Sequence, residues 1–266
     1  MHDGTRDVRD GDRPGNRAPG VGVGPWVGSW PDDPRYDPEL LEHGDRRNVV
    51  DRYRYWRLEA VVADLDSRRH PVHVAVENWQ HDLNIGSVVR TANAFLVAEV
   101  HVVGRRRWNR RGAMVTDRYQ HVRHHPSVAD LAGWAASAAL PLLGVDNLPG
   151  ALPLETYDLP EACVLVLGQE GPGLSAEARS ACRDVLSVAQ YGSTRSINAG
   201  AAAAIALHAW VRRHRFGQVP RAEVGPEGAG FGGPGAGPPD AGLPDAGLPD
   251  AGLPDAGLPG VDPSLP

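Results

Sequence analysis

The stretch that decides the fold begins with Val72-His-Val-Ala-Val76 and leads to Asn84-Ile-Gly-Ser-Val-Val-Arg90-Thr-Ala-Asn-Ala-Phe95. The first run is rich in β-branched residues, which favour a buried strand. The second opens with Asn84, a good N-cap residue, and repeats apolar residues at helical spacing, so we predict a helix with one buried face. Residues 99–103 predict the next strand. Strand, helix and strand with short connections form a βαβ unit, which implies a parallel sheet.

Arg90 lies off the apolar stripe of this predicted helix. A lone arginine on a helix is usually a solvated surface charge. The alternative is a functional position. Asn84 and Arg90 would then lie after the end of a strand, at a helix N-terminus, where free amides and the helix dipole attract anionic groups. The remaining motifs of the chain have to decide between these two interpretations.

Both ends of the chain have compositions that are typical of disorder. Residues 1–45 are rich in Gly, Pro, Asp and Arg with few periodic apolar residues, and the C-terminal segment repeats Asp-Ala-Gly-Leu-Pro four times from Asp240 to Pro259. Such segments cannot bury enough apolar surface to offset the entropy lost on ordering. We therefore predict one folded domain, residues 46–219, between disordered tails at 1–45 and 220–266.

The net charge of −6 arises in the C-terminal tail. From Arg221 onward the chain has seven acidic residues and one arginine, so residues 1–220 are formally neutral. Within them, residues 105–123 hold seven arginines against Asp117, with Trp108 and Tyr119 interleaved. Arginines with aromatic residues suit phosphate binding and base stacking, although a solvated loop has the same composition. Our candidates for RNA contact are Arg105, Arg106, Arg107, Arg110 and Arg111.

A second aromatic stretch, residues 48–66, predicts an amphipathic helix that enters the domain. Its aromatic and arginine residues could form an RNA-stacking surface, but packing against the domain is the preferred interpretation.

The two cysteines, Cys163 and Cys182, indicate neither a disulfide framework nor a metal site. The histidines at 121, 124 and 125 lack partner cysteines, so we expect no metal. Without a leader or a run long enough to span a bilayer, we expect a cytoplasmic protein with no membrane partner.

Two further motifs follow predicted strands. The buried run Cys163–Leu167 ends in Gly168-Gln-Glu-Gly-Pro-Gly-Leu-Ser175, a glycine-rich turn that holds Glu170 at its tip. This is neither the glycine pattern of a dinucleotide site nor a P-loop, so alone it predicts a ligand loop at the carboxyl ends of parallel strands. After a strand at 185–188, Ser196-Ile-Asn198 precedes an alanine-rich helix from Ala199 to about His214. Its small residues permit close backbone approach.

In this order, the motifs at Asn84, Gly168 and Ser196 resemble those of the SpoU/TrmH family of SPOUT-class RNA 2'-O-ribose methyltransferases. The resemblance covers about residues 70–215. It implies an α/β fold whose parallel sheet carries a C-terminal trefoil knot, and a homodimer. It also implies S-adenosylmethionine as methyl donor, without a metal. The expected reaction is methylation of a ribose 2'-hydroxyl in tRNA or rRNA.

The resemblance also assigns roles to residues. The backbone around Val145, Gly168, Val188 and Ile197, with Ser196, would bind the methyl donor. The catalytic group would be Arg90, Glu170, Ser196 and Asn198, supported by Asn84.

Two questions stay open at this point. The first is the role of Arg90, for which the resemblance implies a general base. A guanidinium is effectively never deprotonated in ordinary protein sites, so the alternative is a clamp on the RNA phosphate. The alternatives to the ribose methyltransferase are a non-catalytic RNA-binding or ribosome-assembly protein of the same fold, and an enzyme that methylates a base.

Overall fold

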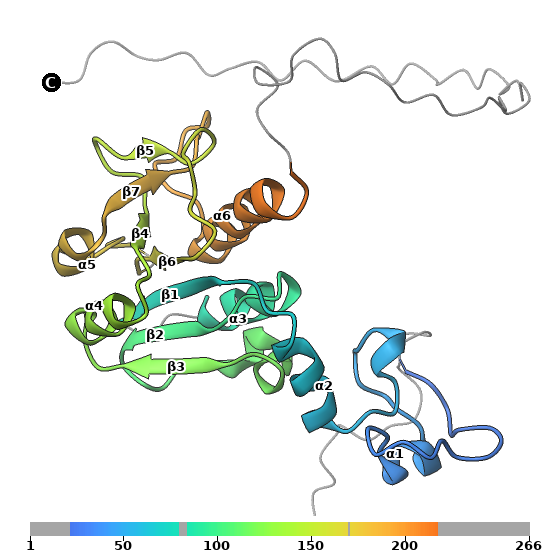
Figure 1. Ribbon diagram of the computed structural model, residues 1–266. Helices are drawn as coiled ribbons and strands as arrows, with labels where there is room; N and C mark the ends of the chain where they lie inside the picture. The colour runs from blue at the N-terminus through green and yellow to red at the C-terminus, as the bar shows by residue number, and fades with distance from the viewer. Residues whose placement is uncertain (1–21, 80–83, 170, 218–266) are drawn as a thin grey trace, which may run out of the picture. The chain divides into compact units, whose positions relative to one another are not determined.

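The computed structural model describes residues 22–79, 84–169 and 171–217. It contains a seven-stranded sheet of order β3-β2-β1-β6-β4-β7-β5, in which every neighbouring pair is parallel (Figure 1). The predicted α/β fold with a parallel sheet is therefore confirmed. The strands are β1 (Val72–Asn78), β2 (Val100–Gly104), β3 (Val122–His125), β4 (Leu142–Val145), β5 (Leu152–Pro153), β6 (Cys163–Leu167) and β7 (Asp184–Ser187).

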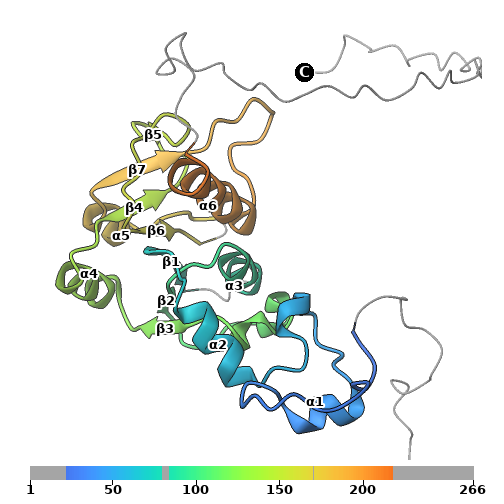
Figure 2. The same ribbon diagram turned by 45° about the vertical axis from the view of Figure 1, so that its right-hand side comes forward.

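Helices lie on both faces of the sheet, which is why the central strands read as continuous apolar runs. On one face α3 and α6 pack over the larger core cluster, and on the other α4 and α5 pack over the second (Figures 1 and 2). The helices are α1 (Pro38–His43), α2 (Leu58–Asp66), α3 (Ile85–Ala94), α4 (Val128–Ser137), α5 (Ala176–Ala181) and α6 (Ala199–His214), with short 3-10 turns η1 (Asp51–Tyr53), η2 (Arg110–Ala113) and η3 (Thr116–Arg118).

The contact between α3 and α6 is made close by small residues. A Cβ atom on Gly200, in the first turn of α6, would lie 2.5 Å from Ser87 Oγ of α3. Further along, α6 inserts the fully buried Trp210, whose Nε1 donates to the carbonyl oxygens of Pro160 and Glu161 at 3.2 and 3.0 Å. The alanine-rich sequence thus lets the two helices that carry the first and third motifs meet.

The prediction of a disordered tail over residues 1–45 is wrong for residues 22–45. Asp37 caps α1, and Asp45 is fully buried and accepts hydrogen bonds from Arg47 Nε, Arg47 Nη2 and Tyr55 N at 2.9, 2.7 and 2.9 Å. Trp26 adds edge-on contacts to Tyr36 and Tyr55. A polar network and aromatic contacts order this segment in place of the aliphatic periodicity that the sequence lacks. Residues 1–21 and 218–266 lie outside the described residues.

The continuous helix predicted over residues 48–66 is also wrong. The segment forms η1 and then α2, separated by Tyr55 with a positive φ of 62°. The backbone of Tyr55 forms its hydrogen bonds with the N-terminal segment and not within a helix. Tyr55 N donates to Asp45, and Tyr55 O accepts from Asp37 N at 2.8 Å. Contacts with the N-terminal segment therefore compete with helical hydrogen bonding at this point. As preferred, the aromatic residues pack inward, with Tyr53 and Trp56 buried beside Val61.

We expect Asp45→Ala to destabilise this N-terminal segment by about 3 kcal/mol, because removing one partner of a buried ion pair leaves the other uncompensated. Burial alone would raise the pKa of Asp45, but the hydrogen bonds from Arg47 and Tyr55 outweigh it and lower the pKa. Limited proteolysis should show faster cleavage within residues 22–57. Asp33→Ala removes a similar but exposed pair with Arg35 and should change the rate little. Equal rates for the two variants would contradict the role of Asp45.

Candidate functional site

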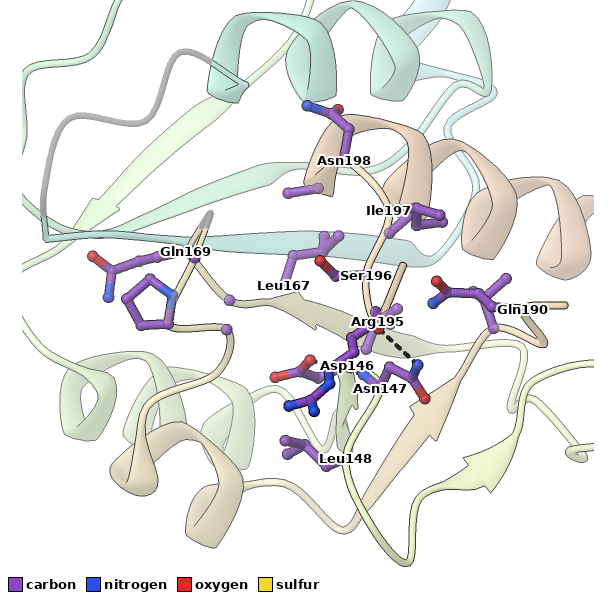
Figure 3. A pocket seen from close by; sticks show the side chains of 18 residues that line it. Asp146, Asn147, Leu148, Leu167, Gln169, Gln190, Arg195, Ser196, Ile197 and Asn198 are labelled. Atoms are coloured by element: carbon purple, nitrogen blue, oxygen red, sulfur yellow. Dashed lines mark hydrogen bonds between the residues drawn. The ribbon is translucent and has the colours of Figure 1, made fainter. Parts of the chain in front are cut away.

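A cavity of about 470 Å³ lies at the carboxyl ends of β4 and β6 and beside the segment after β7 (Figure 3). This edge is where parallel α/β sheets commonly bind ligands. Three loops and the start of α6 surround the cavity. The five residues predicted to bind a methyl donor all line it: Val145, Gly168, Val188, Ser196 and Ile197.

The loop after β4 ties the other two loops together. Asp146 Oδ2 accepts a hydrogen bond from Leu174 N at 2.8 Å, in the turn after β6. The neighbouring Asn147 Nδ2 donates to Arg195 O at 2.9 Å, in the segment after β7 (Figure 3). This pair was not predicted from the sequence, where its one signal is a polar dipeptide directly after a buried strand.

The glycine-rich turn after β6 closes on itself. Gln169 and Gly173 exchange backbone hydrogen bonds of 3.1 and 3.0 Å, and a Cβ atom on Gly168 would lie 2.0 Å from the carbonyl carbon of Gly173. Only glycine fits at such an approach. Glu170, the predicted carboxylate at the tip, lies outside the described residues.

A buried carboxylate that was not predicted as a site residue from the sequence accepts a hydrogen bond from the end of this turn. Glu77, at the end of β1, is fully buried. Its Oε2 accepts from Ser175 N at 2.8 Å, and its Oε1 accepts from Trp79 Nε1 at 2.9 Å. Glu77 therefore anchors the end of the glycine-rich turn to the strand that precedes the first motif.

Asn198 joins the first and third motifs. Its Oδ1 accepts from Gly200 N and Ala201 N at 2.9 and 3.2 Å, which caps α6, and its Nδ2 donates to Asn84 Oδ1 at 2.9 Å. Asn84 occupies the N-cap position of α3 as predicted, but its side chain makes no capping hydrogen bond there. The pairing with Asn198 takes that place, and it links two residues that are 114 positions apart.

Arg90 is exposed on α3, as a solvated charge would be. Ser196 and Asn198 line the cavity, whereas Asn84 and Arg90 do not. The structure thus brings Asn84, Ser196 and Asn198 together and leaves Arg90 outside the cavity.

The arginine-rich segment packs on the helix that carries Arg90. A Cβ atom on Gly86 of α3 would lie 2.7 Å from Ala113 N of η2, so the two backbones are in contact. The five arginines proposed to contact RNA are all exposed: Arg105, Arg106, Arg107, Arg110 and Arg111. None of the helices among the described residues combines the length and the hydropathy that a membrane span requires.

Comparison with known proteins identifies relatives of this chain. The model of the SpoU rRNA Methylase family matches residues 71–208. A Mycobacterium bovis protein described as an uncharacterized tRNA/rRNA methyltransferase is 29% identical over 178 residues, which are 64% of this chain and 54% of that protein. A protein of the same description from Mycolicibacterium paratuberculosis is 33% identical over 165 residues, covering 59% and 51% of the two chains. The chain thus spans about half the length of these curated relatives.

Solved structures share the fold. The SpoU methyltransferase AviRb from Streptomyces viridochromogenes, in complex with the cofactor AdoMet, is 26% identical with a TM-score of 0.50 and covers 56% of this chain and 60% of its own. The A. aeolicus TrmH/SpoU tRNA modifying enzyme has a TM-score of 0.53 at 19% identity, with 60% and 84% of the two chains covered. At that identity the second likeness concerns the fold alone.

Proposed function

The chain belongs to the SpoU rRNA methylase family, and from this premise we propose that it transfers a methyl group from S-adenosylmethionine to a ribose 2'-hydroxyl of tRNA or rRNA. One observation carries the proposal: five residues assigned to donor binding, which come from the chain at or after the ends of β4, β6 and β7, line a single cavity. Its volume of about 470 Å³ is within the range of small-molecule sites. The related AviRb, which has been solved with AdoMet, supports the choice of donor.

The donor would be held mainly by backbone atoms of the three loops. The turn at Gly168 and the segment around Val188 and Ile197 bring main-chain donors and acceptors to the wall, because glycine and tight turns allow close approach. Asp146 and Asn147 would act by fixing these loops in place. A preformed site of this kind reduces the ordering cost of binding.

The transfer needs a positioned hydroxyl and a means to stabilise its developing negative charge. Ser196 and Asn198 lie at the cavity, and the hydrogen bond to Asn84 holds the Asn198 side chain in place. We assign Glu170 to the same group. For Arg90 we favour the clamp over the base, because its exposed, planar guanidinium can bind a phosphate with two parallel hydrogen bonds.

We further propose that two copies of the chain pair through α6 and complete the site. Ile205 of α6 is 42% exposed and Ile197 before it is 36% exposed, an apolar surface suited to a second copy. Arg90 does not line the cavity of its own chain, which also supports a site to which a second copy contributes residues. Light scattering coupled to gel filtration should give twice the chain mass.

A trefoil knot at the C-terminal end is part of the same proposal. The hydrogen bond from Asn147 to Arg195 supports it, because the segment after β7 passes against the loop after β4 before α6 returns to the sheet.

We expect the triple variant Arg105→Ala/Arg106→Ala/Arg107→Ala to weaken RNA binding and to flatten its salt dependence. For every phosphate that the variant no longer binds, the slope of log K against log salt should fall by about 0.7 to 0.9. Filter binding to a tRNA pool at several salt concentrations measures this slope. Arg179→Ala, an exposed arginine on α5 at the opposite face, is the matched control. An unchanged slope in the triple variant would remove this segment from the RNA site.

The function itself is tested by incubating the protein with labelled S-adenosylmethionine and separate tRNA and rRNA pools. We expect label in one pool, and nuclease digestion should place it on ribose rather than on a base. Donor binding measured by calorimetry separates the enzyme from a non-catalytic RNA-binding protein of the same fold. A protein that binds donor and labels neither pool would refute the proposed reaction.

A further inference from the structure

Three histidines from neighbouring strands form a hydrogen-bonded chain on the face of the sheet that α4 covers. His73 of β1 places Nδ1 3.0 Å from Nε2 of His101 in β2, and His101 Nδ1 lies 2.9 Å from Nε2 of His125 in β3. His101 is fully buried, and the ring of Trp134 from α4 lies over it with 4.2 Å between centroids. The cluster lies on a different part of the sheet from the proposed donor cavity, and methyl transfer gives it no role.

A carboxylate adjoins the first two histidines. Glu99 immediately precedes β2, its carbonyl oxygen accepts from Val74 N of β1 at 3.2 Å, and its Oε2 lies 4.0 Å from His101 Nε2. The potential ligand atoms of His73, Glu99 and His101 all lie within 4.8 Å of one another. We propose that these three side chains bind a zinc ion, with water as the fourth ligand.

The interatomic distances fit this ion. Zinc bonded to nitrogen and oxygen at about 2.0 to 2.1 Å in a tetrahedral site places its ligand atoms about 3.3 Å apart. The two measured separations from His101 Nε2, 3.0 Å to His73 and 4.0 Å to Glu99, lie on either side of that value. The third separation, between His73 and Glu99, is within 4.8 Å, so the site forms when the side chains of His73 and Glu99 rotate to bring their ligand atoms to that spacing.

The proton arrangement of the histidine chain is also compatible with a metal. A neutral imidazole has one N–H, so His101 donates through one nitrogen and accepts through the other. When His101 Nδ1 donates to His125, Nε2 carries the lone pair and faces His73 Nδ1. Binding zinc then requires only that His73 carry its proton on Nε2. A metal-bound histidine commonly donates its other N–H in this way, and His125 is the acceptor here.

The carboxylate is likewise held by a neighbour. Arg123 Nε donates to Glu99 Oε2 at 3.0 Å, which orients the carboxylate and leaves Oε1 as a second possible ligand atom. His73 and Glu99 are both half-buried, so solvent reaches the site and supplies the fourth ligand and an entry path. The ion would link the neighbouring strands β1 and β2.

The test is a zinc titration of the full chain without a histidine tag, in competition with a chromogenic chelator. We expect one zinc per chain and an affinity that falls at least tenfold in Glu99→Gln. The matched control is His121→Gln, since His121 forms an exposed pair with Asp66 at 2.8 Å outside the cluster. Its zinc affinity should equal that of the unaltered chain.

Two further measurements keep the test decisive. His73→Gln should show the same loss as Glu99→Gln, with circular dichroism confirming that both variants fold. Cobalt added in place of zinc should give the visible absorption of a tetrahedral ion in the unaltered chain and not in either variant. Equal zinc affinity in the chain and both variants, or no stoichiometric binding, would overturn the site and leave a hydrogen-bonded imidazole chain.

Discussion

Replacing Arg90 with alanine is expected to lower methyl transfer by at least about a thousandfold while the affinity for S-adenosylmethionine stays within about twofold. The two effects separate because Arg90 lies outside the proposed donor cavity, on an exposed face of α3. A preorganised cation that stabilises developing charge contributes roughly 10² to 10³ in rate, and weaker phosphate binding adds to this. Single-turnover transfer to the identified RNA and calorimetric donor titration measure the two quantities.

The variant Arg90→Lys distinguishes the two roles considered for this residue. A lysine retains the charge but not the planar pair of N–H donors, so a clamp loses part of its action. We expect transfer by Arg90→Lys to lie between that of the unaltered enzyme and Arg90→Ala. If Arg90→Lys restored full activity with an alkaline-shifted pH profile, the clamp would be the wrong assignment. Unchanged turnover in Arg90→Ala would remove the residue from the mechanism.

Replacing Gly168 with alanine is expected to weaken donor binding by at least about a hundredfold. The added Cβ atom would lie 2.0 Å from the carbonyl carbon of Gly173 and 2.1 Å from Leu174 N. Both neighbours are backbone atoms held by the Gln169 bridge and by Asp146, so the turn has to open to relieve the overlap. Since overpacking costs about 1 to 3 kcal/mol or more, the cavity wall would be displaced.

The matched control for this substitution is Gly133→Ala in α4. A Cβ atom there meets nothing within 4 Å, and alanine favours a helix, so donor affinity should be unchanged and stability slightly higher. Calorimetry with S-adenosylmethionine gives the affinity, and thermal unfolding shows whether the domain remains folded. If Gly168→Ala bound the donor normally, the glycine-rich turn would not form the wall of its site.

Elements with strong local patterns were predicted closely from sequence. The buried strand at Cys163–Leu167 and the helix at Ala199–His214 have the predicted bounds, because a run of buried β-branched and leucine residues or a long alanine-rich stretch carries its preference locally. The order of strands and helices also implied the parallel sheet. The segment 22–45 was not predictable in this way, since its order depends on Asp45 contacting Arg47 and Tyr55 rather than on periodic apolar residues.

The sequence by itself determined the βαβ unit, the parallel sheet and the three motifs that mark the family. Only the tertiary structure decided which residues meet: Asn198 with Asn84, Glu77 with Ser175, and Asp146 with Leu174. Each pair joins segments at or near the ends of different strands and helices, and their distance apart in the chain ranges from 28 to 114 residues. The physical reason is that local composition sets the conformation of a segment, whereas strand order and helix packing set which segment ends come within hydrogen-bonding distance.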